Sequence, residues 1–241
     1  MKFKDTKYGD LSGQHYYGNI DVSGLELTSL EGAPEIVEGD FNCKNNKLTS
    51  LEGAPKKISG KFNCSYNKLV SLKGGPKIVS WNYNCSYNQL TSLEGGPKEV
   101  KIEYECSNNK LKTLKGAPKI VNKFSCDGNE LETLEGAPKK ISGKFNCSYN
   151  QLTSLEGAPE FVGDDFDCSE NKLKTLKGLP KKLGGNVKCY DNLNPHLEVE
   201  AKIRQKYPDL PDNEIIGKMI EINSDYAKYY YPPEIIELFI F

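Results

Sequence analysis

The stretch that decides the fold is residues 62–93, FNCSYNKLVSLKGGPKIVSWNYNCSYNQLTSL. It contains the tetrad Asn-Cys-Ser-Tyr twice, led by Asn63 and by Asn84, so a cysteine and an asparagine recur 21 residues apart. The chain has eight cysteines, and they keep this interval except for one step of 20: Cys43, Cys64, Cys85, Cys106, Cys126, Cys147, Cys168 and Cys189. Self-similarity at a period near 20 residues predicts a solenoid, in which each repeat forms one coil.

Each repeat reads F-x-C-x-x-N-x-L-x-S-L-x-G-A-P-x-x-I/V, and its first half is typical of a strand. Phe62 and Cys64 alternate with Asn63 and Ser65, which places one pair in the core and the other on an open face. We therefore expect the cysteines to stack as a ladder of small buried residues. An asparagine follows each cysteine by three residues, and we expect its amide to hydrogen-bond the turn backbone of neighbouring coils, because buried amides need partners.

The second half of each repeat cannot be an ordinary helix. A Gly-x-Pro tripeptide recurs in it, as at 53–55 and 157–159. Glycine and proline disfavour helix interiors, whereas proline suits extended geometry. The sequence therefore predicts an all-β-rich solenoid with a curved parallel sheet in front, a thin extended, polyproline-like back, and a small α-helical cap at its C-terminal end.

The repeats are expected to span residues 18–192. Residues 1–17 are expected to form an N-terminal cap segment, because terminal coils expose the core unless something covers them. After Asn192 the period stops, and residues 197–207 and 213–230 have helical spacing, followed by a third apolar piece at 235–241. We interpret residues 193–241 as a helical cap. The alternative is a separate tail that binds a protein or dimerises.

The segment CSYNQLTSLEGAP, residues 147–159, resembles known repeat families. The pattern N-x-L-x-x-L and the one-coil period are similar to the short leucine-rich repeats of bacterial type III effectors. The chain resembles still more closely the LTSLEGAP repeat proteins encoded in tailed-phage and related bacterial genomes. Over residues 18–192 this resemblance implies a leucine-rich-repeat-like binding scaffold without a defined activity, and a phage origin implies a host protein as partner. The ubiquitin-ligase activity of some effectors does not carry over, because every cysteine here is a repeat position.

The composition excludes several classes of function. The 241 residues are 37% hydrophobic and 27% charged with a formal net charge of −1, so nothing draws the whole chain to nucleic acid or anionic lipid. No apolar run is long enough to span a membrane, and residues 1–7 lack the apolar core of a secretory signal. These features predict a cytoplasmic protein, in the host cell if it is viral, with no membrane partner.

We predict no enzymatic activity, no metal and no cofactor. The cysteines never fall in the close pairs that a zinc or redox site needs, and the chain has only two histidines. Cys189 and His196 are the nearest cysteine and histidine in the second half of the chain, and we interpret them as a core thiol beside a surface imidazole.

Function is expected on the open side of the strands, the concave face of the solenoid, because exposed positions vary without disturbing the core. Tyr66 and Tyr87 fall on adjacent coils there and offer large contact areas, while asparagine and the serine after five of the cysteines offer adaptable hydrogen bonds. The predicted partner-binding residues are Lys61, Asn63, Tyr66, Asn84, Tyr87, Glu103, Glu105, Lys144, Asn146, Tyr149, Asp165 and Asp167. The alternative is that tyrosine is a tolerated repeat residue, since KFNCSYN occurs at both 61–67 and 144–150.

Charged residues leave further alternatives open. The pairs Glu103 with Glu105 and Asp165 with Asp167 are interpreted as solvated charge, with cation binding or acid-base chemistry as the alternative. A stripe of lysines follows the prolines on the back: Lys56, Lys77, Lys98, Lys119, Lys139 and Lys181. The stripe indicates an alternative function, binding of nucleic acid or of an acidic partner, although glutamates interrupt it and arginine is scarce.

Overall fold

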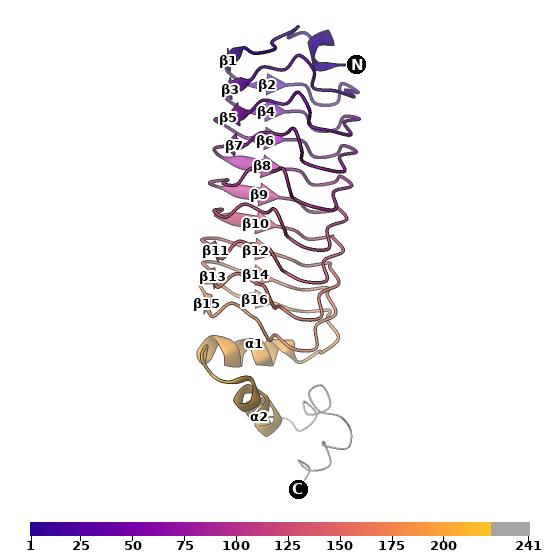
Figure 1. Cartoon of the computed structure of the whole chain (residues 1–241). Coiled ribbons are helices and arrows are strands. Elements are labelled where there is room, and N and C mark those ends of the chain that lie inside the picture. The colour runs from indigo at the N-terminus through magenta and orange to yellow at the C-terminus, as the bar shows by residue number, and fades with distance from the viewer. Residues whose placement is uncertain (223–241) are drawn as a thin grey trace.

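The structure is a computed structural model, and it describes residues 1–222. The chain forms a parallel β-solenoid of about eight turns, which confirms the predicted fold class. The coils stack along one axis, with the N-terminus at one end and two helices beyond the last coil at the other (Figure 1).

A nine-stranded parallel sheet runs the length of the solenoid. Its registers place the aromatic residue of one coil beside that of the next, as Phe62 beside Tyr83. The exposed side of this sheet, predicted above as the concave face, is called the front face below. In spatial order its strands are β2 (Ile20–Asp21), β4 (Phe41–Asn42), β6 (Phe62–Asn63), β8 (Asn82–Asn84), β9 (Glu103–Glu105), β10 (Lys123–Ser125), β12 (Phe145–Asn146), β14 (Phe166–Asp167) and β16 (Val187–Lys188).

The back of the coils is extended, and part of it pairs into a second set of short parallel strands that follow the prolines. One group is β1 (His15–Tyr17), β3 (Ile36–Glu38), β5 (Lys57–Ile58) and β7 (Ile78–Val79). The other is β11 (Lys140–Ile141), β13 (Phe161–Val162) and β15 (Lys182–Leu183). Isolated bridges continue the ladder between the groups. The sequence predicted the extended backbone but not this pairing, because short two-residue strands leave no periodic signal.

The core consists of stacked ladders of identical positions. All eight cysteines are buried, as predicted, and thiols such as that of Cys64 donate to a carbonyl of the next coil, Asn84 O, at 3.4 Å. Aromatic rings at one repeat position, two residues before each cysteine, form a ladder from Phe41 to Phe166 with centroids 5.1 to 6.0 Å apart. Each coil therefore buries its apolar side only against its neighbours, as expected for a solenoid.

The repeat asparagines join adjacent coils, as predicted. Asn88 Nδ2 donates to Cys64 O of the preceding coil and to Cys85 O of its own, both at 3.1 Å. Its Oδ1 accepts the backbone N–H of Leu69, also in the preceding coil, at 2.9 Å. One side chain thus satisfies backbone groups of two coils, and these groups would otherwise be buried without partners.

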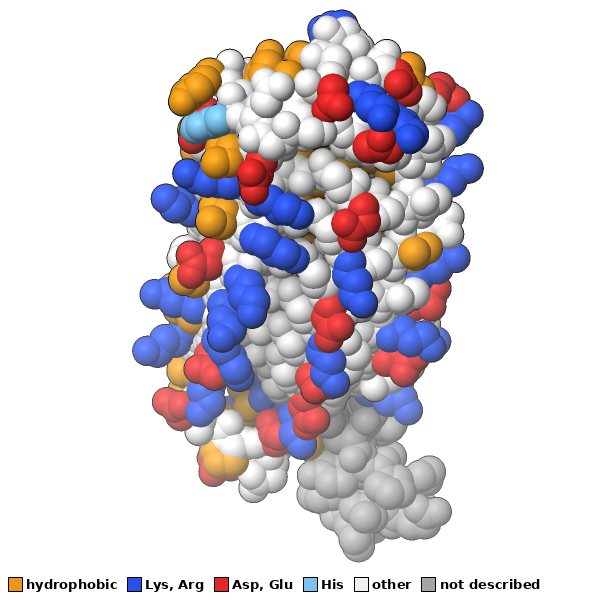
Figure 2. Space-filling model, turned by 45° about the horizontal axis from the view of Figure 1, so that its top comes forward, with side chains coloured by type: hydrophobic (Ala, Val, Ile, Leu, Met, Phe, Trp, Pro, Cys, Tyr) orange, Lys and Arg blue, Asp and Glu red, His pale blue; other side chains and the backbone are white. Residues whose placement is uncertain are grey.

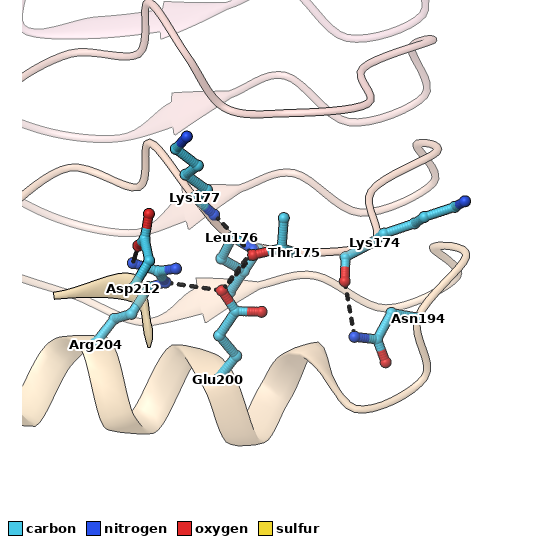
Figure 3. A network of polar contacts seen from close by, with 8 residues as sticks. All are labelled: Lys174, Thr175, Leu176, Lys177, Asn194, Glu200, Arg204 and Asp212. Atoms are coloured by element: carbon cyan, nitrogen blue, oxygen red, sulfur yellow. Dashed lines mark hydrogen bonds and ion pairs between the residues drawn. The ribbon is translucent and has the colours of Figure 1, made fainter. Parts of the chain in front are cut away.

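The C-terminal end is closed by α1 (Leu197–Lys206), followed by α2 (Asp212–Ile222). Inside the array, the backbone N–H of a coil leucine donates to the next coil, as Leu155 N does to Lys177 O at 3.1 Å. The last coil has no following coil to supply this acceptor. The carboxylate of the buried Glu200 in α1 replaces it and accepts hydrogen bonds from Leu176 N and Thr175 Oγ1, both at 2.8 Å (Figure 3).

The glutamate is itself held by an arginine on the same helix. Arg204 Nε donates to Glu200 Oε1 at 2.8 Å, and Arg204 Nη1 reaches Asp212 at the start of α2, 3.0 Å away. Leu197 and Ala201 of α1 join the main core. The two predicted helices are therefore present. The rest of the second predicted helix and the apolar piece at 235–241 lie outside the described residues.

Candidate functional site

The predicted binding residues have the expected accessibility. Lys61, Tyr66, Tyr87, Lys144 and Tyr149 are exposed, and the asparagines and carboxylates among the twelve are half-buried on the front face. The serines are an exception, because alternation predicted them on the open face and the structure buries them: Ser65, Ser86, Ser107, Ser148 and Ser169. Most of these hydroxyls donate a hydrogen bond to a neighbouring side chain, as Ser65 Oγ does to Asn63 Oδ1 at 2.7 Å, and this holds them away from solvent.

Tyr66 and Tyr87 form a stacked pair beside the strands. Their ring centroids are 4.2 Å apart and nearly parallel, at 8°, although the side chains remain 52% and 45% exposed. Both residues have a φ of 56°, in the left-handed region that bulky side chains rarely adopt. The backbone is left-handed at this repeat position in the other coils too; some carry Asn108 or Gly128, which suit that conformation, whereas others carry Tyr149 or Glu170. The tyrosines are therefore not the residues that the backbone favours there.

A groove opens next to this pair, with a volume of about 430 Å³. We call it the acidic groove. Its carboxylates are fixed by amides of the adjacent coil: Asn84 Nδ2 donates to Glu105 Oε2 at 2.8 Å. Burial raises the pKa of Glu105, and the nearby charges of Glu103 and Asp127 raise it further. The residues that line the groove are Ser65, Tyr66, Asn84, Ser86, Tyr87, Glu103, Glu105, Ser107, Asn108, Ser125 and Asp127.

A second groove, of about 240 Å³, shares Glu103 with the acidic groove and extends over the following coils, and it contains both acidic and basic side chains. Lys144 Nζ lies 3.2 Å from Asp165 Oδ2. A hydrogen bond from the Asn186 backbone, and then Lys144, lower the pKa of Asp165, while Asp165 raises that of Lys144. Asn146 and Asp167 also line this groove.

Three predicted residues line neither groove. Asn63 Oδ1 accepts both the backbone N–H and the hydroxyl of Ser65. Lys61 uses its backbone N–H to bind Asp40 Oδ1 at 2.7 Å. Tyr149 is exposed but has no second tyrosine beside it, because the next coil carries a glutamate at that position. The two copies of KFNCSYN therefore stand in different surroundings.

Sequence reasoning missed Trp81 and Ile102. They are 51% and 41% exposed on adjacent coils, just before β8 and β9, and Ile102 N donates to Trp81 O at 3.1 Å. Elsewhere this repeat position is often glycine, as at Gly39 and Gly60. The only tryptophan of the chain, at a position where a small residue is usual, was the signal that could have identified an apolar patch at this edge of the front face.

The lysine stripe on the back is exposed, but its charge is partly balanced. Lys139 pairs with Glu160 at 3.2 Å and Lys181 with Asp209 at 3.5 Å. On the face drawn in Figure 2, basic side chains run along the solenoid beside a column in which acidic and basic side chains alternate. The back therefore does not present a single sign of charge.

The buried thiols are poor nucleophiles. Burial raises the pKa of the Cys85 and Cys189 thiols to about 12, so both are protonated at neutral pH, whereas the reactive species is the thiolate. The other six thiols are shifted in the same direction by burial. Within residues 1–222, no three His, Cys, Asp or Glu side chains converge in a way that would hold a metal ion.

No family model matches this chain, and no curated protein is significantly similar to it. In the part of the chain that the structure describes, each helix is too short or too polar to cross a membrane.

Proposed function

We propose that this chain is a non-enzymatic interaction module that binds another protein through its front face. The observation that carries this proposal is the exposed Tyr66–Tyr87 stack, which stands on the left-handed turn of two adjacent coils, a conformation that bulky side chains rarely adopt. Unusual backbone conformations of this kind cost about 1–3 kcal/mol each and concentrate at functional positions. Aromatic residues also supply most hot spots of protein interfaces.

The surroundings of the tyrosines have the composition of an interface. The acidic groove lies over the front strands β8, β9 and β10, and the exposed Trp81 and Ile102 come just before β8 and β9. Protein-binding surfaces usually combine apolar and aromatic residues with directed polar groups. The resemblance to phage-encoded repeat proteins makes a host-cell protein the first class of partner to test.

The experiment is affinity capture with matched variants, followed by mass spectrometry. Tyr66→Ala with Tyr87→Ala should weaken capture at least tenfold, because each truncation of a hot spot costs about 2 kcal/mol or more. Charge reversal at Lys56, Lys77 and Lys98 on the back is the control and should leave capture unchanged. If the control abolishes capture and the tyrosine variant does not, the front face is not the binding surface.

A second candidate is binding of an acidic partner on the back. It is favoured by one feature, a groove of about 870 Å³ lined by Lys139, Lys140, Lys181 and Lys182 around the ring of Phe161. Lys140 Nζ lies 5.3 Å from the centre of that ring. The ion pairs of Lys139 and Lys181 weaken this candidate. Loss of capture after charge reversal at Lys140 and Lys182, which line the groove, would support it.

A further inference from the structure

The acidic groove contains a buried hydroxyl without a partner. Ser86 is only 4% exposed, and its Oγ makes no hydrogen bond within residues 1–222. The equivalent hydroxyls of Ser65 and Ser148 each donate to an asparagine of their own coil, at 2.7 and 2.8 Å. The equivalent hydroxyl of Ser169 also lacks a partner among the described residues, but Ser169 does not line the acidic groove. A buried polar group without a partner is destabilising, so a ligand that supplies a hydrogen-bonding partner for Ser86 is favoured.

The charge of the groove is unbalanced. Glu103, Glu105 and Asp127 contribute three carboxylates, and none of the described residues that line the groove is basic. The stacked rings of Tyr66 and Tyr87 line the same groove. A fitting ligand group therefore carries positive charge, donates hydrogen bonds in several directions and has a flat surface that packs against aromatic rings.

We propose that the acidic groove receives an arginine side chain of the partner protein. The guanidinium group is planar, has five N–H donors, stacks on aromatic rings and is weakly hydrated, so it matches the carboxylates, Ser86 Oγ and the tyrosines together. A lysine ammonium is compact and strongly hydrated, and it cannot stack. A metal ion fits less well, because no three ligating side chains converge within residues 1–222. The identity of the partner as a protein rests on the proposed function.

The test is a ¹⁵N NMR titration of the full chain with Nα-acetyl-arginine methylamide. The backbone amide signals of Ser86, Tyr87 and Glu105 should shift, with a dissociation constant of about 1 mM, as expected for one isolated side chain. The matched citrulline derivative has nearly the same shape but no charge, and it should bind at least tenfold more weakly. The lysine derivative should also bind several-fold more weakly.

Variants locate the site. Ser86→Ala and Glu105→Gln should each weaken binding of the arginine derivative about tenfold. Ser148→Ala removes the equivalent hydroxyl from the second KFNCSYN copy, where it is bonded to Asn146, and should leave binding unchanged. The dispersion of the remaining NMR signals shows whether each variant is folded. Equal shifts with arginine and citrulline, no effect of Glu105→Gln, or displacement of the arginine derivative by equimolar calcium chloride would overturn the inference.

The two proposals fail separately. If partner capture is lost in the tyrosine variant but unaffected by Ser86→Ala and Glu105→Gln, the front face binds the partner and the arginine assignment is wrong. The other outcome is that the arginine derivative binds but Tyr66→Ala with Tyr87→Ala does not weaken capture of the partner. The proposed function is then contradicted, and so is the assignment of the arginine to a partner protein.

Discussion

The side chain of Tyr104 occupies core space next to Gly96 that a larger residue at position 96 would need. In most repeats alanine precedes the proline and phenylalanine begins the following strand, but the two repeats with glycine before the proline have tyrosine in the strand. The last repeat has leucine before the proline and valine in the strand. A Cβ added at Gly96 would lie 3.3 Å from the Tyr104 hydroxyl, 3.1 Å from Leu72 Cδ1 and 3.2 Å from Leu93 O. The larger residue at one position is therefore accommodated by the smaller one at the other.

This packing predicts a non-additive double variant. Gly96→Ala should destabilise the protein by about 1–3 kcal/mol, the usual cost of overpacking a core. Tyr104→Phe removes a hydroxyl that has no nitrogen or oxygen partner among the described residues, so its own effect should be small. The double variant restores the Ala-Phe combination of the other coils and should recover most of the loss, giving a coupling energy of about 0.5–3 kcal/mol.

Urea unfolding followed by circular dichroism gives the three differences, provided that the slope of the transition does not change among the variants. The reciprocal control uses a coil with alanine before the proline and phenylalanine in the strand. There Phe145→Tyr should lower the free energy of unfolding, and adding Ala137→Gly should restore most of it. Additive effects in both cycles, with coupling below about 0.5 kcal/mol, would refute the shared-volume explanation.

Three other predictions concern the thiols, the cap and Glu105. All eight cysteines should react with a thiol reagent only after denaturation, because burial keeps them protonated; rapid labelling of several in the native protein would contradict the buried ladder. Glu200→Ala should destabilise by about 1–3 kcal/mol, because Leu176 N and Thr175 Oγ1 lose their acceptor, whereas Glu198→Ala on the exposed side of α1 should not; equal melting temperatures for the two would argue against this role of Glu200. The pKa of Glu105 is raised above its ordinary 4.5, so its contribution to stability is present below that pH and is lost as the pH rises through the raised value. Glu105→Gln should therefore melt no lower than the unaltered protein at pH 7, while binding cations less well, and a clear drop in its melting temperature at that pH would contradict the raised pKa.

Much of this architecture could be predicted from the sequence because each repeat position occurs about eight times. Alternation at Phe62 and Cys64 was enough to place the strand, and the recurrent asparagine was enough to predict the bridge between coils. Alternation could not show that Ser86 would be buried, because a short polar side chain can turn back onto the sheet. Nothing local marked Glu200, whose hydrogen-bond partner lies 24 residues earlier in the chain. The period was enough to place Tyr66 and Tyr87 on adjacent coils, but it could not show that their rings stack, because that depends on the side-chain rotamers.

The asparagine bridge has a consequence for how such a chain changes over generations. Each bridge joins a coil only to the one before it, and Glu200 of the C-terminal helix bonds the last coil leucine and the threonine before it. Duplication or loss of one whole unit in the gene would therefore leave every remaining joint intact and move the far end by one strand spacing, about 4.8 Å. The separation between two recognition elements on the front face is thus adjustable in discrete steps by recombination, without the compensating substitutions that a globular core would demand.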